Sequence, residues 1–387
     1  MSVKEKDKIL ILSATFGDGH KQVAKAISEA VNFYATDLEP ITIDVMQWLH
    51  PYLYPVSNYF YKKVIKKFPN IYGYFYQKTK KRNSFSDKLD VLFTSGMDTM
   101  LDIIKRVNPK VVVSTYPFAA SIISKLKEQR LIDIPVVTII TDYTNHSYWI
   151  HPFTDQYLVG SEQVKVSMIA SGVESDKIKC TGIPIMQKFA HTQPRDQLAL
   201  KYSLNSAQFT ILVMGGGDGF IGKGIKVFKA FEKLDVPIQL IIICGRNKKL
   251  QKQLSEELPD SKHKILLLGY CENINELMAI SDLLISKPGG VTITEAIAME
   301  LPLLIYHPLP GQEEENADYL IELGLAMLCK NENDVMNKIQ EMMNNSFQLD
   351  LIKHRTKLFQ TKNSSIDAVD VILQASYNRR ERSIVQD

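Results

Sequence analysis

Short apolar runs alternate with segments of helical periodicity along nearly the whole chain, and this alternation constrains the fold more than any other feature. A polar break, HTQPRD at residues 191–196, separates two series of such runs. The first series comprises Lys8–Ser13, Ile41–Met46, Val111–Thr115, Val136–Thr141 and Gln156–Gly160. The second comprises Thr210–Met214, Ile238–Cys244, Ile265–Leu268, Leu283–Ser286 and Leu303–Tyr306. Strands that alternate with helices form parallel sheets, so we predict an α/β protein with two doubly wound, Rossmann-like domains facing each other across a cleft.

The polar break also sets the domain boundary. We assign residues 1–192 to an N-terminal domain and residues 193–360 to a C-terminal domain. Residues 361–387 are predicted to form a terminal helix with a charged tail, because Ile366, Val369 and Leu373 recur at helical spacing before the run RRER.

Composition narrows the class of protein. The chain has 387 residues, of which 45% are hydrophobic, enough for two domains that each bury a full core. The net charge of +3 gives no global argument for nucleic acid, and we expect none as a partner. Cys180, Cys244, Cys271 and Cys329 are widely spaced, so we expect reduced, mostly buried thiols in a cytosolic protein and no metal site. With no signal sequence and no apolar run of about 18 residues, we expect a soluble or peripheral protein.

Two loops near the C-terminal end carry the most specific signal for chemistry. The strand that ends at Ser286 runs into KPGG (287–290), and the strand that ends at Tyr306 leads to PGQEEEN (310–316); each loop opens a helix. Parallel strands bring both helix N-termini to one edge of the sheet, where α/β proteins bind ligands. Free N–H groups and the positive end of the helix dipole favour a diphosphate there.

Side chains that accept hydrogen bonds accompany these phosphate donors. Glu295, Gln312 and Glu313 can accept from neutral sugar hydroxyls. Each loop alone favours an ordinary strand–helix turn with an acidic helix start. The two together favour a nucleotide-sugar site.

Two further glycine loops follow strands. The first, Thr15–His20 (TFGDGH), places His20 near the start of a helix expected from Lys21, as a candidate general base that the helix dipole keeps neutral. A structural helix cap is the alternative for His20 alone. The second, Gly215–Phe220 (GGGDGF), predicts another diphosphate cradle before a helix. Neither loop has the GxGxxG of a dinucleotide fold or the Lys-Ser/Thr of a P-loop, which argues against an ATPase.

A carboxylate also follows a strand of the N-terminal series, in the sequence TDY at residues 141–143. Asp142 could orient a histidine or take the proton of an acceptor. A helix cap is an equal alternative for this residue.

Residues 46–85 differ in amino-acid composition from the rest of the chain. They contain eight Lys and Arg residues, no Asp or Glu, and many aromatic side chains. On a helical wheel over residues 56–68, an aromatic and aliphatic face lies opposite a basic one, which is typical of a helix in the surface of an anionic membrane. The alternatives are a surface helix packed on its own domain, and a groove for single-stranded nucleic acid. The candidates for membrane contact are Trp48, Phe60, Lys62, Lys63, Lys66, Lys67 and Phe68.

Together these motifs resemble those of the processive diacylglycerol glycosyltransferases of Gram-positive bacteria. The chain is similar, more distantly, to plant monogalactosyldiacylglycerol synthases and to the lipid-linked N-acetylglucosaminyltransferase of peptidoglycan synthesis. The resemblance is carried by LSATFGDGHKQVAKAI, TDYTNHSYWIHP, CTGIPI, VMGGGDGF, ICGRN, LGYCENINELM, SKPGGVTITEA and PLPGQEEENADY, which span nearly the whole chain. It implies the GT-B fold, inverting chemistry and a nucleotide-sugar donor.

The resemblance also implies roles for residues. His20 is the expected catalytic base, Glu295 the ligand of the ribose hydroxyls, and Gln312 with Glu313 the ligands of sugar hydroxyls. The other expected donor-binding residues are Gly216, Gly217, Lys287, Gly289, Gly290, Thr292 and Asn316, with the glycines and Thr292 around the diphosphate. One departure is GGGDGF, where many relatives have GAxG, which alters the contacts expected at the pyrophosphate.

The reaction that follows is one in-line displacement. The 3-hydroxyl of 1,2-diacylglycerol attacks the anomeric carbon of a UDP-sugar, His20 with help from Asp142 takes the proton, and a β-glycoside forms; repetition gives longer glycolipids. Residues 1–192 would hold the acceptor and the membrane, and residues 193–360 the UDP-sugar. We expect no obligate metal or other cofactor, since there is no DxD motif, and a peripheral location on the cytoplasmic face of the cell membrane. Glucose is favoured by resemblance alone; the alternatives are UDP-galactose, another lipid-linked or soluble acceptor, and a non-catalytic nucleotide-sugar sensor.

Overall fold

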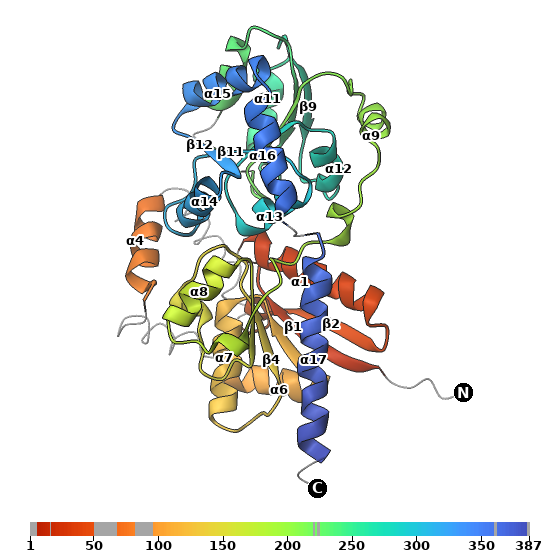
Figure 1. The fold of residues 1–387 in the computed structure, drawn as a ribbon, viewed down its shortest axis with the longest axis vertical. Helices are drawn as coiled ribbons and strands as arrows, with labels where there is room; N and C mark the ends of the chain where they lie inside the picture. Colours follow the sequence, from red (N-terminus) through yellow and green to blue (C-terminus); the bar gives the residue numbers. More distant parts are fainter. Residues whose placement is uncertain are drawn as a thin grey trace, which may run out of the picture. The chain divides into compact units, whose positions relative to one another are not determined.

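The computed structural model describes residues 6–15, 17–49, 68–81, 96–219, 221–222, 225–359 and 362–384. The chain divides into two compact units. Unit 1 comprises Met1–Gln187, Pro310–Gln312 and Asn363–Asp387, and unit 2 comprises Lys188–Leu309 and Glu313–Lys362. Each unit contains a six-stranded parallel sheet covered by helices on its two faces (Figure 1).

The sheet of unit 1 has the strand order β2-β1-β3-β4-β5-β6. Its strands are β1 (Asp7–Ser13), β2 (Leu38–Asp44), β3 (Val111–Ser114), β4 (Val136–Ile139), β5 (Gln156–Val159) and β6 (Ile178–Cys180). Its described helices are α1 (Asp18–Tyr34), α2 (Val45–Leu49), α4 (Pro69–Thr79), α6 (Met97–Val107), α7 (Pro117–Glu128), α8 (Glu162–Ala170) and α17 (Ser364–Ile384), with 3-10 turns η1 (Ser147–Trp149) and η2 (Ser175–Lys177). The 3-10 turn η3 (Gln187–Phe189) includes the last residue of this part of unit 1 and the first two residues of unit 2.

Alternation along β1 explains why helices cover both faces of this sheet. Leu10 and Leu12 pack with buried side chains of α6 and α7. Ile9 and Ile11 point to the opposite face, because successive side chains of a strand alternate. On this second face α1 and α17 lie side by side, and α17 also contacts β3 and β4 (Figure 1). The C-terminal helix therefore belongs to the core of unit 1.

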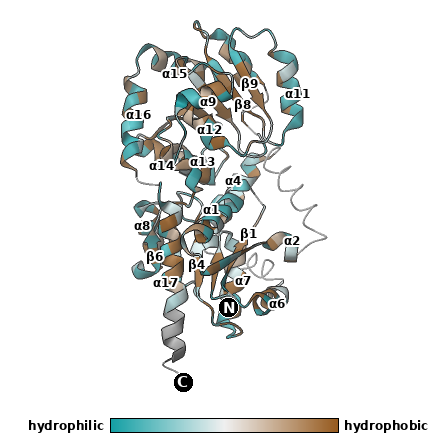
Figure 2. Ribbon diagram, turned by 90° about the vertical axis from the view of Figure 1, so that its right-hand side faces the viewer, coloured by the Kyte–Doolittle hydropathy of each residue, from teal (hydrophilic) through white to brown (hydrophobic). Residues whose placement is uncertain are grey.

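The sheet of unit 2 has the order β12-β11-β10-β7-β8-β9. Its strands are β7 (Thr210–Met214), β8 (Gln239–Ile243), β9 (Lys264–Leu268), β10 (Leu283–Ser286), β11 (Leu303–Tyr306) and β12 (Ala326–Cys329). Its helices are α9 (Arg195–Lys201), α10 (Lys226–Ala230), α11 (Lys248–Glu257), α12 (Ile274–Ala279), α13 (Gly290–Ala298), α14 (Gln312–Glu322), α15 (Glu332–Asn344) and α16 (Phe347–Leu358), with the 3-10 turn η4 (Phe231–Lys233). The strands are apolar and the outer faces of the helices polar (Figure 2).

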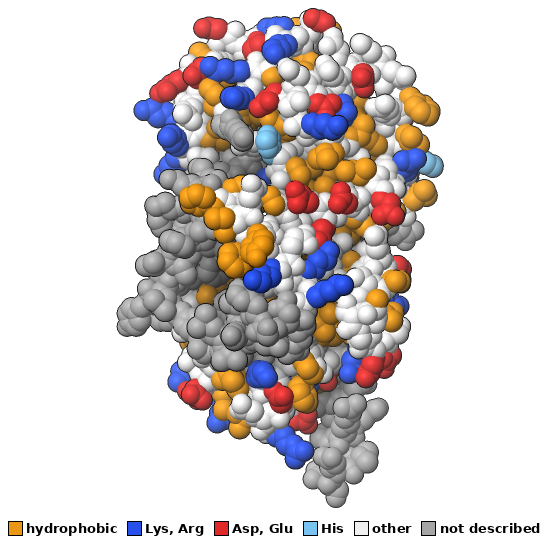
Figure 3. Space-filling model, turned by 90° about the vertical axis from the view of Figure 1, so that its left-hand side faces the viewer, with side chains coloured by type: hydrophobic (Ala, Val, Ile, Leu, Met, Phe, Trp, Pro, Cys, Tyr) orange, Lys and Arg blue, Asp and Glu red, His pale blue; other side chains and the backbone are white. Residues whose placement is uncertain are grey.

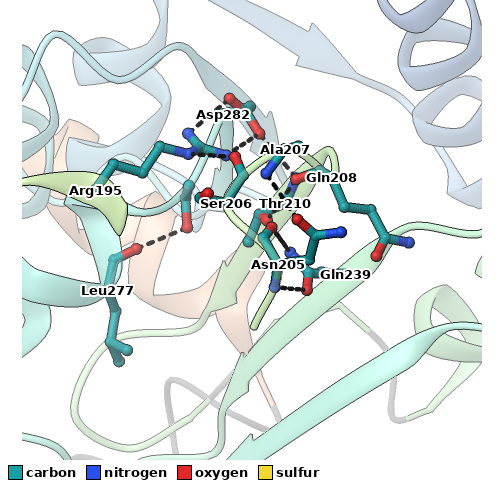
Figure 4. A network of polar contacts seen from close by, with 10 residues as sticks. Arg195, Asn205, Ser206, Ala207, Gln208, Thr210, Gln239, Leu277 and Asp282 are labelled. Atoms are coloured by element: carbon teal, nitrogen blue, oxygen red, sulfur yellow. Dashed lines mark hydrogen bonds and ion pairs between the residues drawn. The ribbon is translucent and has the colours of Figure 1, made fainter. Parts of the chain in front are cut away.

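A polar network joins the start of unit 2 to the amino-terminal ends of three central strands of its sheet (Figure 4). Arg195 donates two hydrogen bonds of 2.9 Å to the carboxylate of Asp282, just before β10. The same carboxylate accepts the backbone N–H of Thr210, the first residue of β7, at 2.8 Å. The side chain of Gln239 on β8 donates to the hydroxyl of Thr210. Three adjacent strands are thus aligned at their amino ends, which leaves their carboxyl ends to the loops of the site.

The strands predicted from the sequence are present, with limits that differ by a few residues. β2 begins at Leu38 and ends at Asp44, because α2 takes up the residues that follow. The edge strands β6 and β12 were not predicted. Of the cysteines, Cys244 and Cys329 are buried, whereas Cys180 is exposed and Cys271 partly exposed, so the expectation of mostly buried thiols is wrong for half of them.

Candidate active site

His20 lies in the first turn of α1, which begins at Asp18 rather than near Lys21. Its backbone carbonyl accepts a hydrogen bond from the hydroxyl of Thr115, 3.1 Å away. Its ring packs against two aromatic rings, with centroids 5.3 Å from Tyr116 and 6.0 Å from Trp149. The strand end, the helix start and the aromatic wall together fix the position of the imidazole.

The same surroundings keep the imidazole neutral. Burial lowers the pKa of His20 from 6.5 to about 4, and a hydrogen bond with the Thr115 backbone opposes this shift in part. The lowered pKa was predicted from the helix dipole, but the main cause is desolvation, which disfavours the charged ring. At neutral pH the ring carries no charge, and the one of its two nitrogens that bears no hydrogen can accept a proton, as a general base must.

Asp142 lies in the loop after β4 and is linked to His20 through a third residue. The hydroxyl of Thr141 donates to Oδ2 of Asp142 at 3.3 Å and lies 3.2 Å from Nδ1 of His20. Thr141 and Asp142 are both only 4% exposed. His20 and Asp142 were both predicted as site residues from the sequence. Thr141, which links them, was not, although it directly precedes Asp142.

The histidines close behind Asp142 have structural contacts. Nε2 of His146 lies 3.2 Å from the carbonyl oxygen of Tyr76 on α4, and Nε2 of His151 lies 3.2 Å from the carbonyl oxygen of Pro117 at the start of α7. Both tie the loop after β4 to neighbouring elements of unit 1.

In unit 2 the helix N-terminus predicted after β10 is present. α13 begins at Gly290, and its N-cap Gly289 provides no side chain to bond the first N–H groups of the helix. A Cβ at Gly289 would meet no atom within 4 Å, so there is open space beside this N-cap residue. Thr292 lies in the same first turn and is partly exposed. This arrangement can bind an anion through backbone donors.

The glycine loop after β7 lies directly beside the loop after β8. A Cβ at Gly219 would overlap the carbonyl oxygen of Cys244, and one at Gly245 would overlap the carbonyl oxygen of Gly217. Only glycine permits this backbone-to-backbone contact, in which the N–H of Arg246 donates to Gly217 at 2.9 Å. β7 and β10 are neighbours in the sheet, with Met214 paired to Ser286, so this loop and the start of α13 leave adjacent strand ends.

Two features of the glycine loop differ from the prediction. The first helix described after this loop, α10, begins only at Lys226. Asp218 within the loop pairs with Arg246 at 3.1 Å, and the guanidinium of Arg246 lies 5.2 Å from the ring centroid of Tyr270. The ion pair compensates a negative charge that would oppose a diphosphate. Sequence reasoning missed Arg246 and Tyr270, although both stand in motifs, ICGRN and LGYCEN, that it quoted.

Glu295 stands in the second turn of α13 with a buried carboxyl group. It is 8% exposed, and burial raises its pKa to about 8, with the charge of Lys188 opposing the shift. The carboxyl group lies on the helix whose N-terminus is open to an anion. A ligand with a phosphate and hydroxyl groups could bind both features: the phosphate would accept hydrogen bonds from the N–H groups at the start of α13, and the hydroxyls would bond to the carboxyl group of Glu295.

Three further predicted donor-binding residues have partners inside unit 2. Nζ of Lys287 lies 2.9 Å from Oε1 of Glu313, and Oε2 of Glu313 accepts the N–H of Leu309 at 2.7 Å. The amide of Asn316 donates to the carbonyl oxygen of Pro288 at 3.0 Å. These contacts join the KPGG loop to α14. Gln312 is the first residue of α14 and is partly buried.

The residues predicted for membrane contact divide into two groups. Trp48 on α2 and Phe68, the N-cap of α4, are both 54% exposed. Phe60, Lys62, Lys63, Lys66 and Lys67 lie outside the described residues.

Known structures share this fold along nearly the whole chain. The MurG protein of Acinetobacter baumannii aligns with a TM-score of 0.64 and 14% identity, over 96% of this chain and all of that one. Anabaena Alr3699/HepE, in complex with UDP-glucose, aligns with a TM-score of 0.57 and 14% identity over 97% of this chain and 99% of that one. The fold and the site define a glycosyltransferase of the GT-B class.

Sequence relatives identify the family within that class. Residues 20–185 match the monogalactosyldiacylglycerol synthase model, and residues 210–369 match the C-terminal domain of glycosyltransferase family 28. A processive diacylglycerol β-glucosyltransferase of Bacillus pumilus (strain SAFR-032) is 30% identical over 95% of both chains. One of Bacillus cereus (strain G9842) is 31% identical over 96% of this chain and 94% of the relative. The chain belongs to the family of processive diacylglycerol β-glucosyltransferases.

Proposed function

We propose that this protein transfers glucose from UDP-glucose to the 3-hydroxyl of 1,2-diacylglycerol with inversion, and repeats the transfer on its product. The relatives are named for this activity, which favours glucose over galactose. The observation that carries the proposal is His20, a neutral imidazole fixed at the end of β1 by Thr115, Tyr116 and Trp149. A hydroxyl nucleophile needs a base of this kind.

The proposed step is a single displacement. The imidazole takes the proton of the acceptor hydroxyl as its oxygen forms a bond to the anomeric carbon. On the opposite side of that carbon the bond to the diphosphate oxygen breaks, and the electron pair leaves with UDP. Attack opposite the leaving group inverts the α-linked donor to a β-glycoside.

Residues of unit 2, together with Gln312 at the first position of α14, would bind the donor. The N–H groups at the start of α13 and the charge of Lys287 would hold the diphosphate, Glu295 would accept the ribose hydroxyls, and Gln312 with Glu313 would bind the sugar. Preorganised donors of this type contribute about 3 kcal/mol each when charge develops in the transition state. We propose that they replace an obligate metal ion at the leaving group.

The acceptor lipid requires contact with a membrane, and α4 offers a surface for it. Phe68, Ile71, Tyr74 and Phe75 are between 47% and 62% exposed and recur at helical spacing. Lys78 follows on the same helix, 5.7 Å from the ring centroid of Tyr74. α4 lies on the side that faces the viewer in Figure 3, where apolar side chains and lysines are exposed near each other. We propose that the protein binds the anionic cytoplasmic face of the cell membrane through this surface.

No helix among the described residues is long and apolar enough to cross a bilayer.

The test is to incubate the protein with diacylglycerol in mixed micelles and either UDP-glucose or UDP-galactose, and to resolve the lipids by mass. We expect mono- and oligoglucosyl diacylglycerol from UDP-glucose, with and without EDTA. A product only from UDP-galactose would overturn the assignment of the sugar. Bound UDP without any glycolipid would point to a different acceptor or to a sensor, and loss of activity in EDTA that Mg²⁺ restores would overturn the metal-free step.

A further inference from the structure

The hydroxyl of Thr141 has one proton and two neighbours that compete for it. It lies 3.3 Å from Oδ2 of Asp142 and 3.2 Å from Nδ1 of His20. An ionised carboxylate can only accept hydrogen bonds, whereas a neutral imidazole nitrogen can donate or accept. The proton of Thr141 therefore points to Asp142, and the lone pairs of its oxygen face Nδ1.

This order determines which ring nitrogen of His20 carries hydrogen. Because Thr141 accepts from Nδ1, that nitrogen must be protonated in the neutral ring. Nε2 is then the nitrogen with the free lone pair. The hydrogen bond made by one imidazole nitrogen generally fixes the state of the other in this way.

The backbone of Thr115, which directly follows β3, is a second hydrogen-bond partner of the His20 ring. If that contact held a hydrogen on Nε2, the lone pair would move to Nδ1 and face Thr141 instead of a substrate. The Asp142–Thr141 pair decides between the two forms.

We propose that Thr141 is a positioning residue that holds His20 in the Nδ1–H tautomer and thereby leaves Nε2 unprotonated. Asp142 acts through the hydroxyl of Thr141, which makes Thr141 the middle of a three-residue chain. The claim about the tautomer stands on unit 1 alone. The claim that this tautomer supports catalysis rests on the proposed function.

The tautomer can be measured directly by NMR on the full-length protein labelled with ¹⁵N at its imidazole nitrogens. The chain has eight histidines, and the His20 signal is assigned by its absence in a His20→Ala variant. At pH 7.5 we expect the Nδ1–H pattern for wild type and for Thr141→Ser, which keeps the hydroxyl. Thr141→Val removes the acceptor at nearly constant shape, so the Nδ1–H form should lose its dominance.

The chain offers a matched control. Thr138 lies on β4 three residues before Thr141, is fully buried, and its hydroxyl has no hydrogen-bond partner among the described residues. Thr138→Val should keep the wild-type tautomer and fold. An Nε2–H pattern in the wild-type protein, or an unchanged Nδ1–H pattern in Thr141→Val, would overturn the proposal.

Kinetics then test the link to catalysis. We expect Thr141→Val to lower kcat for glycolipid formation about tenfold, which is less than the roughly 100- to 10,000-fold that the general base itself contributes, because the base is still present. KM for UDP-glucose should stay close to that of Thr138→Val. If the tautomer changes as expected but wild type has no transferase activity, the proposed function fails and the positioning role stands. If Thr141→Val loses the tautomer and keeps kcat, the tautomer has no part in catalysis.

Discussion

At the residue scale, the buried carboxyl group of Glu295 couples donor binding to pH. Its pKa of about 8 in the free protein means that the group is mostly protonated at pH 7. Ribose hydroxyls donate to the carboxylate form, so binding must release a proton below pH 8. We predict that affinity for UDP rises about tenfold between pH 7 and pH 9 and levels off above the pKa of Glu295. Isothermal titration calorimetry in buffers of different ionisation enthalpy measures both the affinity and the proton release.

Glu295→Gln is the control for this prediction, because it keeps the shape and removes the titration. Its UDP affinity should be weaker at pH 9 and nearly independent of pH. The variant should also be more stable. A carboxyl group whose pKa rises from 4.5 to about 8 on folding costs stability progressively as pH increases through that window. We expect the stability gain of Glu295→Gln to be absent near pH 4 and largest above pH 8; a gain independent of pH would contradict a raised pKa.

Sequence reasoning succeeded for residues fixed by local spacing. The open start of α13 follows from two glycines after a strand, and the position of His20 follows from its place between β1 and α1. It failed where partners are distant in the chain. Thr141 is 121 residues from His20, and Arg246 is 28 residues from Asp218, so no local pattern could pair them.

At the element scale, α4 is the described helix that bears the proposed membrane surface. Replacing Ile71 and Phe75 together by serine removes apolar area from its exposed face. We predict at least a fivefold weaker binding to vesicles that contain anionic lipid, measured by co-sedimentation. A fivefold loss corresponds to about 1 kcal/mol, well below the roughly 1.5–3 kcal/mol that full burial of one such side chain contributes, since these side chains are only partly buried at a membrane surface. The remaining binding should decrease with added salt, since lysines near an anionic surface act electrostatically.

The matched control is Val166→Ser with Ile169→Ser on α8, which are also exposed and apolar. These changes should leave vesicle binding unchanged. Equal losses in the two double variants, or none in either, would remove α4 from the membrane contact.

The long runs of β-branched and aliphatic residues explain why most strands could be predicted. β1, β3 and β10 are buried on both faces and therefore appear as continuous apolar segments. β6 and β12 are edge strands with exposed positions, IKC and AMLC, and their sequences carry no such signal. The spacing of glycines in the Gly215–Phe220 loop does not reveal where the following helix begins; the first helix described after the loop, α10, begins at Lys226.

At the scale of the whole molecule, the proposed steps of the transfer are divided between the two units. The proposed base and its positioning chain belong to unit 1, while the diphosphate and ribose ligands belong to unit 2. Transfer should therefore depend on both units, whereas UDP binding should depend on residues of unit 2. The transfer rate of Thr138→Val serves as the reference, because this substitution changes the core of unit 1 and leaves the proposed site intact.

The most direct measurement compares wild type and His20→Ala for two properties, UDP binding by calorimetry and glucosyl diacylglycerol formation by mass spectrometry. The account predicts that His20→Ala binds UDP as wild type does and forms glycolipid at least about 100-fold more slowly, the lower end of what a general base contributes. A His20→Ala variant that binds UDP and still forms glycolipid at a rate close to wild type would contradict it.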